Sequence, residues 1–128
     1  GLGGIAVPDE LRGDDVFVTT SVSHAAVLPQ VVAAVHHGGV GTVQAVARAG
    51  ITSIVVPFFA DQPFWGAVLH RQGLAPRPVR PRALTARSLG DALDAVGRYA
   101  APNAELGPLI AAEHGAQTAV EILENATA

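Results

Sequence analysis

Short apolar runs alternate along this chain with segments in which apolar residues recur every three or four positions. The first pattern is typical of parallel strands buried on both faces, and the second of helices that cover a sheet. The pattern predicts strands at residues 16–18, 32–36, 52–56 and, interrupted by prolines, 75–79. It predicts helices at residues 24–28, 41–49, 62–72, 85–98, 104–114 and 117–125.

Single residues at the ends of these segments support the assignment. Gly50 and Gly73 follow two predicted helices, where a left-handed backbone is common, and Thr85 stands where a helix cap is expected. Residues 1–4 are predicted to form a glycine-rich loop, and residues 8–15 a polar connector. Strands and helices that alternate over short connections favour a parallel sheet with right-handed crossovers. The predicted fold is therefore α/β, a Rossmann-like parallel sheet flanked by helices.

Composition narrows the class of protein. The 128 residues suffice for one domain, and a hydrophobic fraction of 49% with 15% charged residues is typical of a folded α/β core. The net charge is −3 and basic residues form no stripe, so we expect no nucleic-acid partner. Without cysteine the chain has neither disulfides nor thiolate metal sites. No apolar run reaches the ~18 residues of a membrane span, and no signal peptide is recognisable, so we expect a cytoplasmic protein.

The most informative motif is the run His-His-Gly-Gly-Val-Gly-Thr at residues 36–42, between a predicted strand and a predicted helix. A glycine-rich bend that leads into a helix directs several backbone N–H groups at one point, which suits a diphosphate. Gly38, Gly39 and Gly41 would admit phosphate oxygens close to the backbone, and Thr42 would add a hydroxyl donor. The alternative is a glycine turn that only packs the helix against the sheet.

The two adjacent histidines are predicted to face opposite ways. We favour His37 as the residue that donates to a phosphate oxygen, because it lies nearer the bend, and His36 as a structural residue. No carboxylate or third histidine stands at a spacing suited to a metal ion. The sequence therefore predicts no metal site.

A second motif follows the next predicted strand. Asp61 and Gln62 each offer paired hydrogen-bonding groups, which suit neighbouring hydroxyls of a sugar. Ligands of parallel sheets bind at the carboxyl ends of strands, so both motifs are expected to line one pocket. The alternative for Asp61 is the cap of a helix that begins near Pro63, and both roles can hold together. Trp65 is more typical of a core anchor than of a sugar platform, but it remains a candidate contact.

The motif at residues 36–42, with Arg48-Ala49-Gly50 and the run Val-Pro-Phe-Phe-Ala-Asp-Gln-Pro-Phe-Trp-Gly at residues 56–66, resembles the nucleotide-sugar-binding domain of GT-B glycosyltransferases. This is the C-terminal domain of those enzymes. The resemblance is closest to sterol glucosyltransferases and to macrolide and glycopeptide antibiotic glycosyltransferases. It implies the C-terminal half of a GT-B fold, truncated at its N-terminus.

The same resemblance implies a domain organisation. Residues 1–128 would form a partial nucleotide-sugar-binding domain, with a core at residues 16–80 and a C-terminal helical part at residues 84–126. The N-terminal acceptor domain of the family would be absent from this chain.

The resemblance also implies a role for each motif. His37 would contact the donor diphosphate and stabilise it as a leaving group, and Asp61 and Gln62 would hold the hexose. The full set implied to bind the nucleotide and its diphosphate is Val22, His37, Gly38, Gly39, Gly41 and Thr42. Further candidates for ligand contact are Ser21, His24 and Trp65.

The function implied is transfer of a hexose from a UDP- or dTDP-sugar to a hydroxyl of a lipid, sterol or natural-product acceptor. The reaction would be inverting and metal-independent, with the nucleotide sugar as co-substrate and no cofactor. The general base would come from the acceptor domain, so we expect this chain alone to be inactive. One alternative is a non-catalytic remnant or partner subunit, whose exposed sheet a partner chain would cover. Another is a sugar-nucleotide epimerase of the same architecture.

Overall fold

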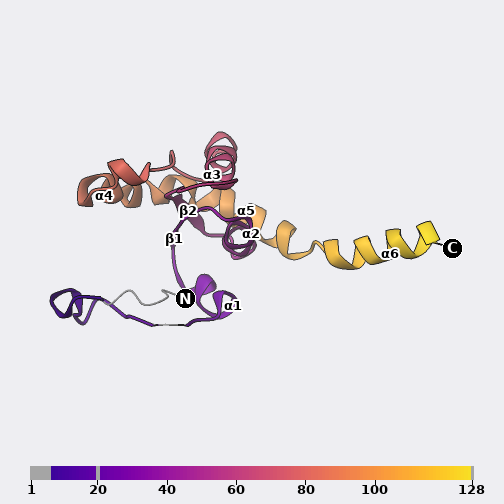
Figure 1. The fold of residues 1–128 in the computed structure, drawn as a ribbon, viewed down its shortest axis with the longest axis horizontal. Helices are drawn as coiled ribbons and strands as arrows, with labels where there is room; N and C mark the ends of the chain where they lie inside the picture. Colours follow the sequence, from indigo (N-terminus) through magenta and orange to yellow (C-terminus); the bar gives the residue numbers. More distant parts are fainter. Residues whose placement is uncertain (1–6, 20, 128) are drawn as a thin grey trace.

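The computed structural model describes residues 7–19 and 21–127, so the loop predicted at residues 1–4 lies outside the described residues. Figure 1 shows the arrangement of the helices and strands in this part of the chain. The strands are β1 (Ala33–His36) and β2 (Thr52–Val55). The helices are α1 (His24–Val27), α2 (Val40–Arg48), α3 (Gln62–Arg71), α4 (Ala86–Asp94), α5 (Ala100–Ala111) and α6 (Gly115–Thr127). Short 3₁₀ segments lie at Asp9–Leu11, Leu28–Gln30, Pro81–Ala83 and Val96–Tyr99.

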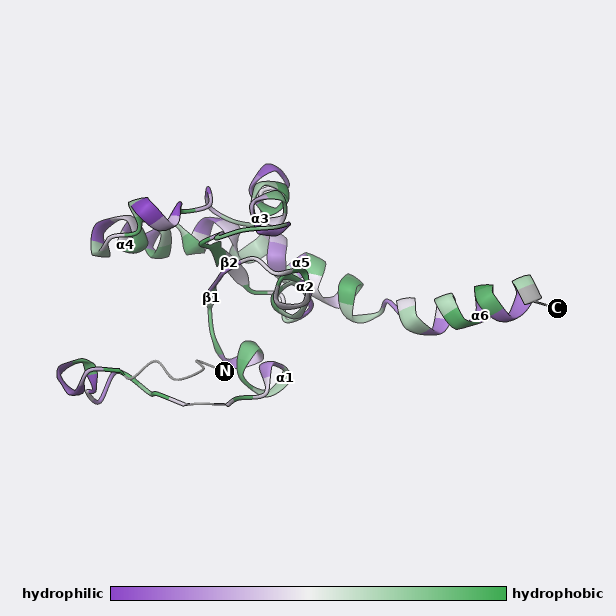
Figure 2. Cartoon of the chain, in the orientation of Figure 1, coloured by the Kyte–Doolittle hydropathy of each residue, from purple (hydrophilic) through white to green (hydrophobic). Residues whose placement is uncertain are grey.

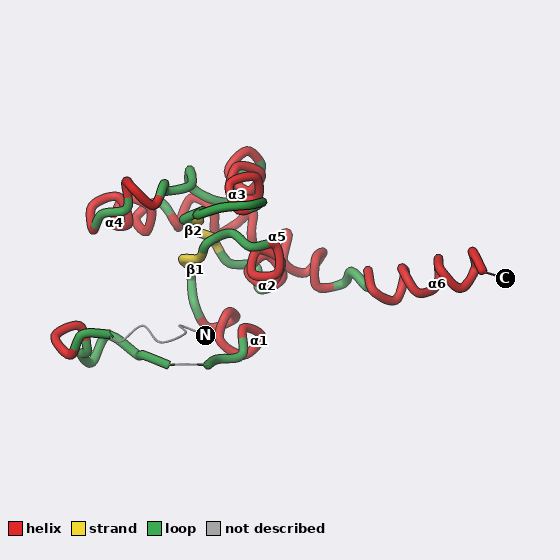
Figure 3. Tube along the Cα trace, in the orientation of Figure 1, coloured by secondary structure: helices red, strands yellow, loops and turns green. Residues whose placement is uncertain are grey.

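The two strands form a parallel pair, with Ala33 opposite Thr52 and His36 opposite Val55 (Figure 3). Helix α2 connects them, as a parallel pair requires a crossover. The carboxyl ends of both strands therefore lie at the same edge of the sheet, where each leads into a loop and a helix. The predicted α/β fold, a small parallel sheet flanked by helices, is confirmed.

Strand β2 lies at the centre of the core. Successive strand residues face opposite sides of a sheet, so β2 contributes to two hydrophobic clusters. On one side Val55 packs with Val43 of α2 and Leu69 of α3. On the other side Ile54 packs with Ala92 and Val96, which belong to the segment around α4. All four residues of β2 are buried, including the polar Thr52 and Ser53, as expected of a strand covered on both faces.

Two of the four predicted strands are wrong. Residues 16–18 form no strand, and Phe17 is 90% exposed, because no described segment lies beside them to complete a ladder. Residues 75–79 run along the outer side of β2 and make a single ladder-like bond, from the Val79 N–H to the Val55 carbonyl at 2.9 Å. Proline at two of these positions supplies no N–H, so the segment stays irregular.

Local signals define the helix ends. Thr85 and Ser88 form a reciprocal capping box at the start of α4, with the Ser88 N–H 3.1 Å from the Thr85 hydroxyl oxygen. Gly50 and Gly73 adopt φ of +70° and +71° just after α2 and α3, as predicted. The helix predicted at residues 85–98 is shorter, because α4 ends at Asp94 and the chain continues as a 3₁₀ turn.

Helix α6 extends away from the rest of the molecule (Figure 1). All residues from 115 to 126 are exposed, and Figure 2 shows hydrophobic residues recurring along this helix. Val120 and Ile122 are 52% and 63% exposed. Among the described residues, no helix combines the length and apolarity needed to cross a membrane.

Candidate functional site

The two sequence motifs meet at Gly38. This residue has φ of +93°, and a Cβ added to it would lie 2.8 Å from Val55 Cγ1 and 3.1 Å from the Gln62 carbonyl oxygen. The bend after β1 therefore packs directly against the start of α3, and only glycine fits there. Gly38 is buried, so at this position the glycine serves packing, while the contact brings the bend beside the Asp61-Gln62 motif.

His36 is directed into the structure. Its Nδ1 accepts the Gly38 N–H at 3.1 Å, and its Nε2 lies 2.9 Å from the buried Ser53 hydroxyl. A backbone N–H can only donate, so Nδ1 carries no proton and Nε2 donates to Ser53. The pKa of His36 is lowered to about 4, mainly by burial and further by the nearby charges of His37 and His24. His36 is therefore a neutral residue that holds the glycine bend to β2.

His37 faces outward, opposite to His36, as the sequence predicted. Its side chain is exposed, and its ring lies over Gly39, where an added Cβ would be 2.5 Å from His37 Nε2. The imidazole therefore lies beside the N-terminal end of α2, next to the N-cap residue Gly39.

The N-terminal end of α2 is open. Gly39 occupies the N-cap position, without a side-chain cap, and its carbonyl accepts the N–H groups of Thr42 and Val43 at 3.0 Å each. The N–H groups of Val40 and Gly41 precede these and have no acceptor within the helix. Gly41 is exposed, and a Cβ there would meet nothing within 4 Å. This helix end offers free amides, a positive dipole and unfilled space, which together suit a phosphate.

The second motif is tied into its own local hydrogen bonds. Asp61 is exposed at the N-cap position of α3, yet its side chain does not cap the helix; Oδ2 instead accepts the Trp65 indole N–H at 2.9 Å. Gln62 is buried, and its Oε1 accepts the N–H groups of Phe58 and Phe59 at 2.9 and 3.2 Å. The side-chain oxygen of Gln62 is therefore already bonded to the backbone of the loop after β2. A ligand would find a carboxylate at Asp61 and at most the amide nitrogen of Gln62.

A cavity of about 360 Å³ lies between α1 and α2, and His24, Leu28 and Ala45 contribute to its lining. The lining from α2 comes from the second half of that helix and its end. Ser21 and Val22, just before α1, are both exposed. Of the candidate nucleotide contacts, His24 therefore borders this cavity.

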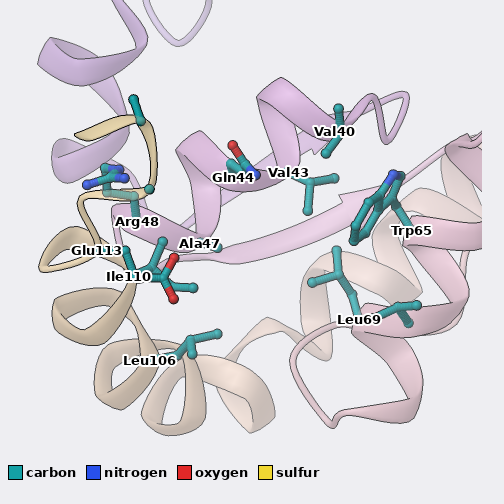
Figure 4. Close-up of a pocket in the computed structure, with 13 residues that line it drawn as sticks. Val40, Val43, Gln44, Ala47, Arg48, Trp65, Leu69, Leu106, Ile110 and Glu113 are labelled. Carbon is teal, nitrogen blue, oxygen red and sulfur yellow. The ribbon is translucent and has the colours of Figure 1, made fainter. Parts of the chain in front are cut away.

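A larger cavity of about 520 Å³ lies between α2, α3 and α5, and Val40 at the open end of α2 contributes to its lining (Figure 4). Trp65 and Leu69 line one side, and Leu106 and Ile110 the other, with Arg48 at its end. Trp65 therefore has its ring in this cavity and its N–H on Asp61. Among residues 7–19 and 21–127, no group of three or more histidine, aspartate or glutamate side chains could hold a metal ion.

Three features of this site were not predicted from the sequence. Val40 begins α2 and contributes an open N–H group; its position just after two glycines was the available signal. The bonds of Asp61 to Trp65 and of Gln62 to the preceding loop were not expected. The spacing of four between Asp61 and Trp65 on one helix could have indicated the first bond.

Comparison with known proteins gives consistent similarities. A family model described as erythromycin biosynthesis protein CIII-like, C-terminal domain, matches residues 5–124. O-mycaminosyltylonolide 6-deoxyallosyltransferase of Streptomyces fradiae is 37% identical over 124 residues, which cover 91% of this chain and 28% of that protein. A sterol 3-beta-glucosyltransferase of Arabidopsis thaliana is 38% identical over 94 residues, which cover 73% of this chain and 14% of that protein.

A solved structure gives the same result for the fold. The crystal structure of the kitacinnamycin glycotransferase superposes with a TM-score of 0.83 at 26% identity, over 95% of this chain and 32% of that one. The chain therefore spans about a third or less of the length of each of these three proteins.

Proposed function

We propose that this chain, which belongs to the family of erythromycin biosynthesis protein CIII-like C-terminal domains, is the donor-binding part of a glycosyltransferase. Its ligand would be a UDP- or dTDP-hexose. The observation that carries the proposal is the contact of the Gly38 bend with Gln62, since it puts an open helix end and an exposed carboxylate at one edge of the sheet. In a nucleotide sugar the diphosphate is joined directly to the hexose, a polyol, so a diphosphate site beside a carboxylate matches these two neighbouring groups.

In this proposal the diphosphate binds at the N-terminal end of α2. The N–H groups of Val40 and Gly41 and the Thr42 hydroxyl donate to its oxygens, and His37 donates from the side. These donors stabilise the charge that develops as the diphosphate leaves, which is the main catalytic contribution expected of this chain. A metal ion is not required for that role. Inversion at the anomeric carbon follows from direct attack by an acceptor hydroxyl, whose general base would be supplied by a separate acceptor domain.

The proposed acceptor is apolar, such as a sterol, lipid or macrolide aglycone. Phe58 and Phe59 are 64% and 71% exposed in the loop between β2 and Asp61, beside the proposed sugar site. Two neighbouring exposed aromatic rings at a ligand edge favour an apolar partner. The similar proteins named above support the same class, since one is a sterol glucosyltransferase and another transfers a sugar to a tylonolide.

Binding of UDP and dTDP, measured by calorimetry, tests the proposal. Substitution of His37→Ala is expected to weaken binding about 10- to 100-fold, as loss of a hydrogen bond to a charged group does. Gly41→Ala is expected to weaken binding to a similar extent, because its methyl group would occupy the space proposed for the phosphate. Gly41→Ala adds a methyl group to space that is empty in the protein, so the melting temperature should not fall.

The matched control is Gly90→Ala, also a helical glycine with open surroundings, which should bind as the unmodified chain does. Unchanged affinity in both His37→Ala and Gly41→Ala would refute the site.

A second candidate is a non-catalytic subunit of the same fold that binds another polypeptide. Exposed apolar residues favour it, above all Phe17 and Val32, which are 90% and 83% exposed. Light scattering and a thermal shift with nucleotide sugar separate the two functions. A donor-binding domain is stabilised by the ligand, because ligand binding to the folded state alone raises its free energy of unfolding. A partner-binding subunit shows no such shift at millimolar ligand.

A further inference from the structure

Asp61 has an unusual environment for a surface carboxylate. It is exposed and lies at the N-cap position of α3, but its backbone is helical, with φ of −79° and ψ of −8°. Its side chain therefore does not cap the helix. The indole N–H of Trp65 donates to Oδ2 at 2.9 Å, and the backbone N–H of Trp65 donates to the Asp61 carbonyl at 3.1 Å. Both ends of the aspartate are thus fixed by one residue, four positions later in the same helix.

The donor in this pair is itself held by the core. The Trp65 ring is half-buried and packs against the cluster of Val43, Val55 and Leu69. Figure 4 shows the indole standing at the wall of the cavity near Val43 and Leu69. Phe64 meets the ring edge-on, with centroids 5.2 Å apart. A rotation of the indole would break these contacts, so the direction of its N–H is set by packing.

In the pair of Trp65 and Asp61, the indole can only donate a hydrogen bond and the carboxylate accepts it. Indole is a donor only, so it bonds the ionised carboxylate of Asp61 and leaves Oδ1 and the remaining lone pairs as acceptors. Vicinal sugar hydroxyls need acceptors at fixed positions. A freely rotating aspartate would lose rotamer entropy on binding them, whereas a carboxylate already held in place does not.

We propose that Trp65 is a positioning residue, which orients the Asp61 carboxylate toward the hexose and so makes the site prefer a nucleotide sugar over the free nucleotide. This inference rests on the proposed function. It assigns to Trp65 a role through Asp61, without direct contact with the sugar. The Trp65 ring lines the cavity between the helices, and its N–H is bonded to the Asp61 carboxylate.

Calorimetry with UDP-glucose, dTDP-glucose and the matching nucleoside diphosphates tests this inference. Trp65→Phe keeps an aromatic ring in the cavity and removes the N–H group. It is expected to weaken nucleotide-sugar binding about tenfold, the usual consequence of losing a hydrogen bond to a charged group, and to change UDP binding less than twofold. Asp61→Asn should have a similar effect, and the double variant should be no weaker than Asp61→Asn alone. The control Gln72→Ala, at an exposed position at the other end of α3, leaves the indole and its contacts unchanged and should bind both ligands normally.

The outcomes separate the two levels of the proposal. Unchanged nucleotide-sugar binding in Trp65→Phe, or parallel loss of UDP and UDP-glucose, would overturn the role of Trp65 and leave the donor site standing. Failure of the unmodified chain to bind any of these ligands would overturn the proposed function, and this inference with it.

Fluorescence supplies a second readout that needs no variant at Trp65. Trp65 is the only tryptophan of the chain, so indole emission reports its environment alone. UDP-glucose is expected to shift this emission and UDP is not, with the difference abolished in Asp61→Asn. An equal shift with both ligands would contradict the role of Trp65.

Discussion

His36 and His37 are neighbours in the sequence, yet only His37 has an exposed side chain. Both ring nitrogens of His36 are occupied, by the Gly38 N–H and by Ser53. A proton added to Nδ1 of His36 would face a donor instead of an acceptor, and it would be partly desolvated. The charge state of His36 is therefore linked to the integrity of the bend that carries the candidate phosphate site.

This link predicts a pH dependence of stability. The pKa of His36 is lowered from 6.5 in the unfolded chain to about 4 in the folded protein. Between these values the unfolded state binds more protons, so the free energy of unfolding should fall as the pH decreases from 6.5 to 4 and level off below. The full shift corresponds to about 3 kcal/mol, and partial exposure of the ring reduces the expected loss to about 1–2 kcal/mol. Urea titrations at several pH values measure it.

Acidic side chains also titrate near pH 4, so the contribution of His36 is read as a difference between variants. His36→Gln should be less stable at neutral pH and show a smaller slope between pH 6.5 and 4. His114→Gln, at an exposed position, is the matched control and should keep the original slope. Equal slopes in the unmodified chain and in His36→Gln would exclude the link.

Helices α2 and α5 approach each other through two glycines. Gly50 has φ of +70°, and a Cβ added to Gly107 would lie 2.8 Å from Gly50 Cα. Arg48 closes the same contact, since its Nη1 donates to the Ala111 carbonyl at 3.0 Å, at the end of α5. The close packing of α5 against the end of α2 thus requires that Gly107 carries no side-chain atoms.

A substitution of Gly107→Ala is therefore expected to destabilise the protein by about 1–3 kcal/mol, because backbone atoms must move to admit the methyl group. Gly90→Ala, in α4 with nothing within 4 Å of the added Cβ, should instead stabilise it by about 0.5–1 kcal/mol through helix propensity. Thermal or urea unfolding of both variants provides the comparison. A neutral Gly107→Ala would show that the helices are not in close contact in solution.

The elements also show what sequence alone can predict. Helices α2, α3 and α4 were predicted nearly in full, because their apolar spacing and their end residues Gly50, Gly73 and Thr85 are local signals. The strand predicted at residues 16–18 was wrong because no described segment lies beside it to pair with, and the one at residues 75–79 because its two prolines supply no N–H to a ladder with β2. The pairing of Asp61 with Trp65 was missed for a related reason, since it depends on a rotamer fixed by distant core residues.

In the whole molecule, the candidate site lies where both strands of a two-stranded sheet end. The two core clusters lie on opposite faces of that sheet, so the edge that carries the glycine bend is left open between them. Such an arrangement fixes the positions of the ligand-binding groups with few residues. It also leaves much apolar surface on the segments before α1 and after α5, which Figure 2 shows.

The projection of α6 has a consequence for the behaviour of the molecule in solution. Its 13 residues extend about 20 Å from the body. A rod attached to a small particle adds friction faster than mass, so this 13.0 kDa chain should sediment more slowly than a sphere of equal weight. In sedimentation velocity, a version ending at Glu113 is expected to have a lower frictional ratio. An unchanged ratio would mean that the helix folds back in solution.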